Sequence, residues 1–242
     1  MFSKTALAKM IDHSLLRADC AEEDVTRFCE EARELRFATA VVCPYWVATA
    51  VKHLRNSDVK VGTVIGFPFG AIPPACKVYE ARQVIAMGAA ELDLVINIGA
   101  VRSGYFDVVR REIEDIVTLA KVAGLTEHGE EILVKVILET GFTTCEEQER
   151  ICRIAEEVRA DFVKTCSGFG PRGVTVDDVR FLRHVVSRDI GIKAAGGIRT
   201  YEQALLLINA GASRLGTSSG PAILEGYARA ERPIPEEVLE RE

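Results

Sequence analysis

The sequence predicts an α/β protein that folds as one TIM-type (β/α)8 barrel, a single domain spanning residues 1–242. Short runs rich in Val, Ile and Leu alternate along the chain with segments whose apolar residues repeat at helical spacing. The runs lack polar alternation, which is typical of parallel strands covered on both faces. Eight strand–helix units in 242 residues match the usual length of a barrel domain.

Eight segments are expected to form the strands of the barrel. A short one near the N-terminus covers residues 10–12, and seven apolar runs follow at 38–43, 59–66, 92–96, 132–138, 161–165, 191–195 and 214–217. About eight helices are expected to accompany these strands.

Local signals predict where several of these helices begin and end. Capping boxes predict two starts, because Thr144 and Thr200 each stand three residues before a Glu or Gln. Glycines in the left-handed conformation often end helices, which predicts three ends at Gly88, Gly124 and Gly211.

An open doubly wound sheet is the structural alternative, since it shows the same alternation of strands and helices. However, no GxGxxG motif follows the first strands. Eight units in a chain of this length also fit the closure of a barrel better than an open sheet.

Composition excludes several classes of partner. The net charge is −6 and no basic stripe occurs, so nucleic acid is not expected as a partner. No segment approaches 18 consecutive apolar residues and the N-terminus lacks a signal-peptide core, so we expect a soluble, cytoplasmic protein without a membrane partner. The seven cysteines form an odd set without a CxxC pair, which indicates reduced thiols.

The C-terminal stretch of residues 231–242 is acidic and contains two prolines. It is expected to be either a mobile tail or a segment that packs on a partner subunit. We expect a homo-oligomer, a dimer or a tetramer, and the sequence does not choose between them.

Polar residues near the ends of the predicted strands are candidates for the active site, because barrel enzymes place their catalytic groups at the C-terminal ends of strands and in the loops that follow. These candidates are Asp12, Asp93, Asn97, Lys135, Glu139, Lys164, Thr165, Ser167 and Lys193.

The lysines are the most informative of these candidates. Lys164 and Lys193 each interrupt an apolar strand, and the two strands are consecutive. Desolvation and a neighbouring like charge both lower the pKa of a lysine, and Lys135 on the preceding strand adds to the same field. A neutral amine is what attack on a carbonyl requires. The alternative is that these lysines point outward or only pair with acids such as Asp93 and Glu139.

Asp93 is a carboxylate inside an apolar strand, where it would be costly without a partner. It is expected to act as a general acid or base near the lysines. The alternative role is that of their structural counter-ion.

Two glycine-rich loops after the last strands predict a phosphate site. Gly196 and Gly197 follow Lys193, and the segment GTSSGP runs from Gly216 to Pro221 with Ser218 or Ser219 near a helix start. Backbone N–H groups at such places attract anions, and barrels often bind phosphate after strands seven and eight. The alternative is plain turn chemistry.

Metal and thiol catalysis are not expected. The four histidines are scattered without ligand spacing, so no metal and no other cofactor are predicted. Cys43 and Cys166 fall near strand ends but have no evident histidine partner, and we interpret both as pocket lining.

Seven ordered motifs resemble those of the deoxyribose-phosphate aldolase family, which are class I aldolases with a TIM-barrel fold. They run over nearly the whole chain and read IDHSLL, VGTVIGFPFGA, ELDLVINIGA, LVKVILET, FVKTCSGFGPRG, KAAGGIRT and RLGTSSG. The resemblance implies reversible cleavage of 2-deoxy-D-ribose 5-phosphate to D-glyceraldehyde 3-phosphate and acetaldehyde, without a metal.

The resemblance also implies roles for residues. Lys164 would form the Schiff base, Lys193 would perturb it and move protons, and Asp93 would be the acid/base of the relay. The remaining candidates would contact the substrate: Gly196, Gly197, Gly216, Ser218 and Ser219 at the phosphate, Ser167 and Asp12 at the sugar hydroxyls or the relay, and Gly168, Lys135 and Cys43 elsewhere in the site.

Three positions depart from the family pattern. Cys166 stands where the family commonly has Ser, Ala195 stands where Ser is frequent, and Phe169 falls where some members carry Lys. The departures do not touch Lys164, Lys193 or Asp93, so they bear on the substrate more than on the reaction. Two alternatives stay open. The chain could be a Schiff-base aldolase of another phosphorylated sugar, or a barrel that binds a phosphosugar without catalysis.

Overall fold

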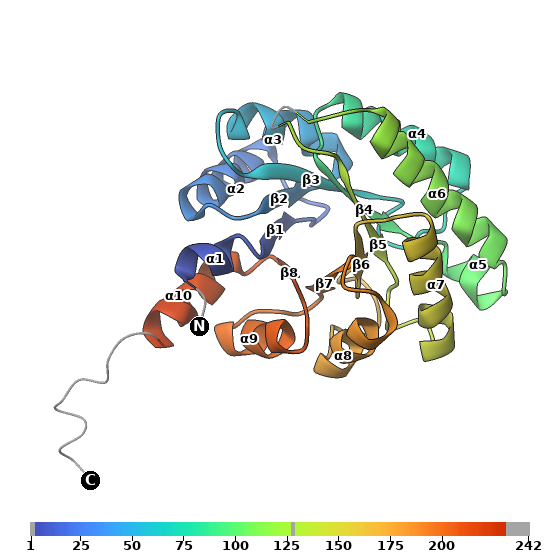
Figure 1. The fold of residues 1–242 in the computed structure, drawn as a ribbon. Helices are drawn as coiled ribbons and strands as arrows, with labels where there is room; N and C mark the ends of the chain where they lie inside the picture. The colour runs from blue at the N-terminus through green and yellow to red at the C-terminus, as the bar shows by residue number, and fades with distance from the viewer. Residues whose placement is uncertain (1–2, 127–128, 231–242) are drawn as a thin grey trace, which may run out of the picture.

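The computed structural model describes residues 3–126 and 129–230. Its eight strands are all parallel and close into a barrel in the order β1 to β8, with β8 paired to β1 (Figure 1). The predicted (β/α)8 barrel is therefore confirmed, and the open sheet is wrong. The predicted tail at 231–242 lies outside the described residues.

The strands are β1 (Ile11–Leu15), β2 (Thr39–Val42), β3 (Lys60–Ile65), β4 (Glu91–Val95), β5 (Leu133–Ile137), β6 (Phe162–Lys164), β7 (Gly191–Ala195) and β8 (Arg214–Thr217). The predictions for the last two strands match these bounds. The first strand runs three residues further than predicted, because His13 and Ser14 interrupt the apolar run although the backbone stays paired with β2.

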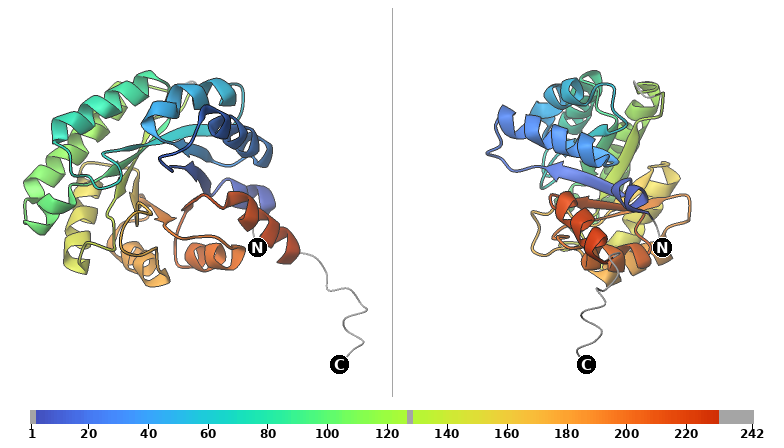
Figure 2. Two further views of the ribbon diagram at one scale, coloured as in Figure 1. Left: turned by 180° about the vertical axis from the view of Figure 1, so that it is seen from behind. Right: turned by 90° about the vertical axis from the view of Figure 1, so that its left-hand side faces the viewer.

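The helices of the described residues are α1 (Lys4–Ala8), α2 (Glu22–Leu35), α3 (Val47–Leu54), α4 (Pro74–Ala86), α5 (Ile98–Arg102), α6 (Phe106–Val122), α7 (Cys145–Glu157), α8 (Val176–Val185), α9 (Tyr201–Asn209) and α10 (Gly220–Ala230), with a 3-10 turn at Pro44–Trp46. Eight of them complete the strand–helix units and surround the barrel (Figure 2). The short helices α1 and α5 are additions that the sequence prediction missed.

The predicted helix boundaries are confirmed. The hydroxyls of Thr144 and Thr200 accept hydrogen bonds from Glu147 N and Gln203 N, and both capping boxes are complete. Gly88, Gly124 and Gly211 follow the ends of α4, α6 and α9 with φ of 100°, 87° and 117°. Only glycine adopts such backbone at little cost, which is why these helices end there.

The two faces of the strands carry different chemistry. Along β4, Leu92 and Leu94 belong to the apolar layer beneath the helices, whereas Glu91 and Asp93 are equally buried but charged. Side chains alternate between the faces of a strand, so these two carboxylates share the opposite face. The apolar layer stabilises the barrel from outside, and the interior is left to the charged groups.

Candidate active site

Lys164 and Lys193 are paired neighbours on β6 and β7, and both side chains are buried in the barrel. Each amine lies 2.7 Å from the same atom, Oδ2 of Asp93. Because Asp93 belongs to β4, these contacts cross the barrel interior. The alternative that the two lysines point outward is therefore wrong.

A second carboxylate and a third lysine complete this cluster. Asp12 Oδ2 on β1 lies 2.6 Å from the Lys193 amine. The Lys135 amine on β5 lies 3.2 Å from Asp93 Oδ1 and 3.4 Å from Asp12 Oδ2. All four groups are at most 1 % exposed, so each charge depends on its neighbours rather than on water.

Glu91 and Arg214 extend the network toward the N-terminal ends of the strands, and sequence reasoning missed both. Arg214 binds Asp12, and its other amino group lies 2.9 Å from Glu91 Oε1. Glu91 also binds Lys135. The two residues stand two positions before Asp93 and Gly216 on their strands, and this spacing could have placed them on the same face.

The network contains four cationic side chains, those of Lys135, Lys164, Lys193 and Arg214, and three carboxylates, those of Asp12, Glu91 and Asp93. One positive charge is therefore in excess if every group is ionised. A net charge in a buried site is unfavourable, so the balance favours one neutral amine.

Lys164 is the group whose pKa responds to this imbalance. Burial lowers its pKa to about 8; the nearby Asp93 carboxylate opposes the shift and the Lys193 ammonium reinforces it. This is the lowered pKa that adjacent strand lysines predict. Burial by itself would also lower the pKa of Lys135. The carboxylates of Asp12, Asp93 and Glu91 outweigh this effect and raise the pKa of that lysine.

The carboxylates of the cluster are held in the ionised form. Burial alone would raise the pKa of Asp93, but the ammonium groups around it lower that pKa well below its usual value. Asp12 behaves in the same way beside Lys135, Lys193 and Arg214, and its pKa is also lowered. Asp93 is thus the counter-ion of both lysines, and its role as a general acid or base stays a prediction.

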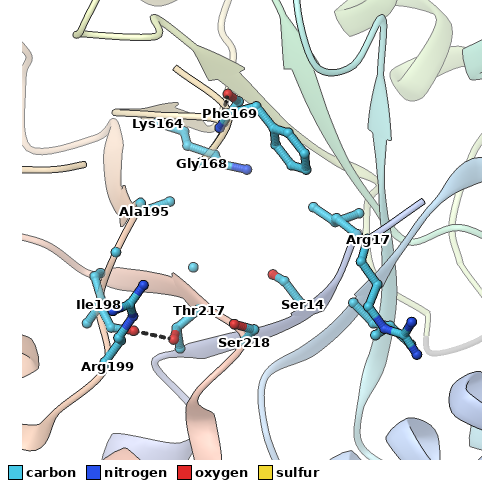
Figure 3. Close-up of a pocket in the computed structure, with 16 residues that line it drawn as sticks. Ser14, Arg17, Lys164, Gly168, Phe169, Ala195, Ile198, Arg199, Thr217 and Ser218 are labelled. Atoms are coloured by element: carbon cyan, nitrogen blue, oxygen red, sulfur yellow. Dashed lines mark hydrogen bonds between the residues drawn. The ribbon is translucent and has the colours of Figure 1, made fainter. Parts of the chain in front are cut away.

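A pocket of about 350 Å³ opens above Lys164 (Figure 3). Lys164 extends toward its centre from the side of Gly168 and Phe169, with Ser14, Thr217 and Ser218 on the far side. Seven predicted site residues line it: Lys164, Ser167, Gly168, Gly196, Gly197, Gly216 and Ser218. All of them come from β6, β7 and β8 or the loops that follow, and β1 supplies the rest of the wall.

The remaining predicted residues lie outside this lining. Asp93, Asp12, Lys135 and Lys193 lie buried in the network beneath it. Cys43 follows β2 on a part of the barrel mouth that does not contribute to the pocket, so its predicted lining role is not supported.

Gly216 serves two purposes in this arrangement. A Cβ atom there would lie 2.9 Å from Lys193 Cε and 2.8 Å from Ala195 Cβ, which is too close for either. The missing side chain therefore leaves room for the stem of Lys193 and keeps the pocket wall flat beside it.

The opposite end of the pocket carries free backbone donors. Gly196 and Gly197 have φ of 109° and 79°, which turns the chain tightly after β7. Among the described atoms, the N–H groups of Gly197 and Ser218 have no acceptor. The N–H of Ser219 instead donates to Thr217 Oγ1 at 2.9 Å, so this N–H is not a free donor, and the predicted role of Ser219 at the phosphate stays a prediction.

Two arginines that the sequence prediction missed also line this pocket, namely Arg17 and Arg199. Arg17 is paired with Asp19 and Asp24. No ion pair of Arg199 is found in the described part of the chain. Both follow strand-end loops, and nothing local in the sequence tells whether such an arginine turns inward.

Glu139 does not pair with the lysines, so of the two acids named as their possible partners the structure supports only Asp93. Its carboxylate accepts hydrogen bonds from the Ser167 hydroxyl and from Ser167 N, the latter at 3.1 Å. Phe169 packs edge-on against Phe67 with ring centroids 5.2 Å apart, so the loops after β6 and β3 touch beside the pocket. The loop at residues 66–71 is otherwise a turn and contributes nothing to the lining.

Comparison with known proteins adds independent findings. Residues 6–226 match the DeoC/LacD family aldolases. A protein of Thermococcus gammatolerans named deoxyribose-phosphate aldolase is 50% identical over 227 residues, which covers 93% of this chain and 98% of the relative. A protein of the same name from Bacteroides thetaiotaomicron is 48% identical over 94% of this chain and 93% of its own length.

Solved structures are similar as well. One described as a unique tetrameric structure of deoxyribose phosphate aldolase from Aeropyrum pernix has a TM-score of 0.85 and 34% identity, covering 94% of this chain and 93% of the other. Another, described as the aldolase QR15, has a TM-score of 0.84 and 36% identity, covering 98% of this chain and 99% of the other.

Proposed function

The chain belongs to the DeoC/LacD family of aldolases, and from that membership we propose that it cleaves 2-deoxy-D-ribose 5-phosphate reversibly to D-glyceraldehyde 3-phosphate and acetaldehyde. It is an enzyme of the carbon–carbon lyase class. The observation that carries the proposal is the buried Lys164 amine, with a pKa lowered to about 8, at the floor of a pocket with free anion donors.

In the proposed reaction, neutral Lys164 attacks the aldehyde carbon of the substrate and water leaves, giving an iminium ion. The hydroxyl at carbon 3 then loses its proton, and the bond between carbons 2 and 3 breaks. Its electron pair moves to the iminium, which becomes an enamine as glyceraldehyde 3-phosphate departs. Protonation of the enamine and addition of water release acetaldehyde and restore Lys164.

Asp93 and Lys193 are proposed to move the protons of these steps, directly or through water. Asp93 Oδ2 lies between the two amines at 2.7 Å from each, so a proton that leaves Lys164 has an acceptor within hydrogen-bond reach. Asp12 and Lys135 hold these two groups in place through their ion pairs.

The substrate phosphate is proposed to lie at the far end of the pocket. The N–H groups of Gly197 and Ser218 would bind its oxygens, together with Arg199. Gly196, Gly216 and Gly168 would line the path between phosphate and amine, and Ser167 would contact a sugar hydroxyl. This anchor would keep the reacting carbon over Lys164.

Borohydride reduction in the presence of acetaldehyde tests the Schiff base. We expect a two-carbon adduct on the peptide containing Lys164, no adduct in Lys164→Ala, and an unchanged adduct in Lys52→Ala, whose lysine lies exposed on α3. A folded wild-type protein without the adduct would remove the proposal and leave a phosphosugar-binding barrel.

A coupled assay for glyceraldehyde 3-phosphate released from deoxyribose 5-phosphate tests the substrate. The second candidate, an aldolase of another phosphorylated sugar, is favoured by Ala195 and Phe169, two family departures that line the pocket. Adduct formation without turnover of deoxyribose 5-phosphate would select that candidate.

Assembly and location are also proposals. A dimer or tetramer is supported by the relative from Aeropyrum pernix that is described as tetrameric. No helix among the described residues is long and apolar enough to cross a membrane, and a cytoplasmic location is proposed. A measurement of mass in solution tests the assembly.

A further inference from the structure

Glu139 is a buried acid beside the pocket that the proposed mechanism does not use. It follows β5, is 1% exposed, and has a φ of 40°, in the left-handed region that glutamate rarely adopts. Its neighbours are bonded to the strand of the reacting lysine, because Leu138 N donates to Lys164 O and Thr140 N donates to Thr165 O. The backbone around Glu139 is therefore fixed relative to Lys164.

Among the described residues, the side chain of Glu139 accepts hydrogen bonds from a single residue, Ser167. Oε2 accepts from both the hydroxyl and the N–H of Ser167, while Oε1 is buried and has no partner among the described atoms. Leaving one oxygen of a buried carboxylate without a hydrogen bond lowers the stability of the fold. The loop after β6 also has another anchor, since Thr165 Oγ1 bonds both O and N of Ala195. Holding the loop does not by itself require a carboxylate at this position.

A carboxylate differs from neutral hydrogen-bonding groups because it can only accept. The proton of the Ser167 hydroxyl is therefore directed at Glu139, and Ser167 Oγ also accepts from Phe169 N at 3.0 Å. A hydroxyl has one proton and two lone pairs. One lone pair is left, and Ser167 lines the pocket three residues after Lys164. In this state Ser167 accepts hydrogen bonds from the pocket but donates none.

We propose that Glu139 is a positioning residue that fixes the Ser167 hydroxyl as an acceptor for the substrate hydroxyl lying between the reacting carbon and the phosphate. Glu139 itself does not line the pocket, so it acts through Ser167. The inference rests on the proposed function and adds a source of substrate selectivity to it. An aldehyde phosphate that lacks this hydroxyl would leave the lone pair of Ser167 unused.

The test compares two acceptors in the synthetic direction, with acetaldehyde as donor: glyceraldehyde 3-phosphate and 3-oxopropyl phosphate, which lacks only the hydroxyl beside the carbonyl. The readout is the ratio of their kcat/KM values. We expect the wild type to favour glyceraldehyde 3-phosphate about tenfold, the equivalent of one hydrogen bond. Glu139→Gln, whose amide can donate to Ser167 Oγ and release the serine proton from its fixed direction, should lower the ratio.

Matched variants separate this role from a structural one. Ser167→Ala, which removes the hydroxyl, should bring the ratio close to one, and adding Glu139→Gln should lower it no further. Ser167→Thr, which keeps the hydroxyl, should retain the wild-type ratio. Gly170→Ala provides a second route if Glu139→Gln does not fold, because its Cβ would lie 2.4 Å from Glu139 Oε1 and displace an unaltered carboxylate.

Three results would overturn the proposal: a wild-type ratio of one, an equal loss on both acceptors in the Glu139 and Gly170 variants, or effects of Glu139→Gln and Ser167→Ala on the ratio that multiply. Failure of the proposed function has a different signature, namely no Lys164 adduct with acetaldehyde and no turnover of either acceptor in the wild type. Adduct formation should be the same in the Glu139 variants and the wild type.

Discussion

Lys164 and Lys193 share one oxygen atom, since each amine bonds Asp93 Oδ2 at 2.7 Å from adjacent strands. A single carboxylate oxygen cannot neutralise two ammonium groups. Lys193 has a further carboxylate partner, Asp12 at 2.6 Å, whereas Asp93 is the one carboxylate that pairs with Lys164 among the described residues. This difference helps to explain the lowered pKa of Lys164, which also faces the pocket.

The pH dependence of the wild type should report the pKa of Lys164. The pKa is lowered to about 8, and only the neutral amine attacks, so kcat/KM should rise about tenfold per pH unit below 8 and level off above it. Steady-state rates between pH 6 and 9.5 measure this. A profile that is flat across pH 8 would contradict the assignment.

Lys193→Leu and Asp93→Asn should shift that pH profile in opposite directions. Lys193 lowers the pKa of Lys164 and Asp93 raises it. The rising limb should therefore move to higher pH in Lys193→Leu and to lower pH in Asp93→Asn. Both variants should also be slower, by about 10²–10⁴-fold where proton transfer is lost.

Lys52→Leu is the control for these two variants, because Lys52 is exposed on α3, away from the cluster. Its profile should match the wild type. Shifts of the same sign in Lys193→Leu and Asp93→Asn would show that the charges around Lys164 do not set its pKa.

Arg199→Ala should weaken only phosphorylated substrates. A charge-assisted hydrogen bond to phosphate contributes about 1.5–3 kcal/mol, so kcat/KM for deoxyribose 5-phosphate should fall about 10- to 100-fold, while that for unphosphorylated 2-deoxyribose stays unchanged. Arg188→Ala is the matched control, since Arg188 is exposed before β7, at the other end of the barrel. Equal losses on both sugars would place the phosphate elsewhere.

Glu91→Gln should lower the free energy of unfolding more than the removal of a surface charge does. It leaves Lys135 and Arg214 with one carboxylate fewer in a buried site, which costs about 3–5 kcal/mol. Urea unfolding followed by circular dichroism measures the change. Glu149→Gln removes an exposed pair with Arg153 on α7 and should leave the free energy of unfolding nearly unchanged. Similar values for the two variants would mean that the network does not stabilise the barrel.

The sequence predicts the strands and the reacting cluster well, because both depend on the contrast between apolar runs and the few charged residues inside them. A short run of Val, Ile and Leu bounded by turn residues is typical of a buried strand, and a lysine or aspartate inside such a run is costly without a partner. Lys164, Lys193 and Asp93 stand out for this reason. Glu91 and Arg214 stand at the first residues of their strands, where only the two-residue spacing to Asp93 and Gly216 separates them from ordinary surface charges.

The pocket wall is harder to predict because it depends on the shape of the whole barrel mouth. Cys43 and Ser167 both follow strand ends, yet the pocket lies on the side built from β6, β7, β8 and β1, where Ser167 lines it and Cys43 does not. Ser219 looks like an anion ligand in sequence, but its N–H turns back to Thr217. Which residues line the pocket therefore depends on loops that are neighbours in the fold but distant in the chain.

The ion pair between Asp12 and Arg214 joins the first strand to the last, across 202 positions of the chain. Its partner carboxylate, Glu91, and the three lysines come from strands in between. The electrostatic environment of Lys164 is therefore complete only after the final strand has docked on the first. A folding intermediate that lacks β8 would retain the lysine but not the surroundings that activate it, so reactivity toward aldehydes during refolding should report closure of the ring rather than collapse of the chain.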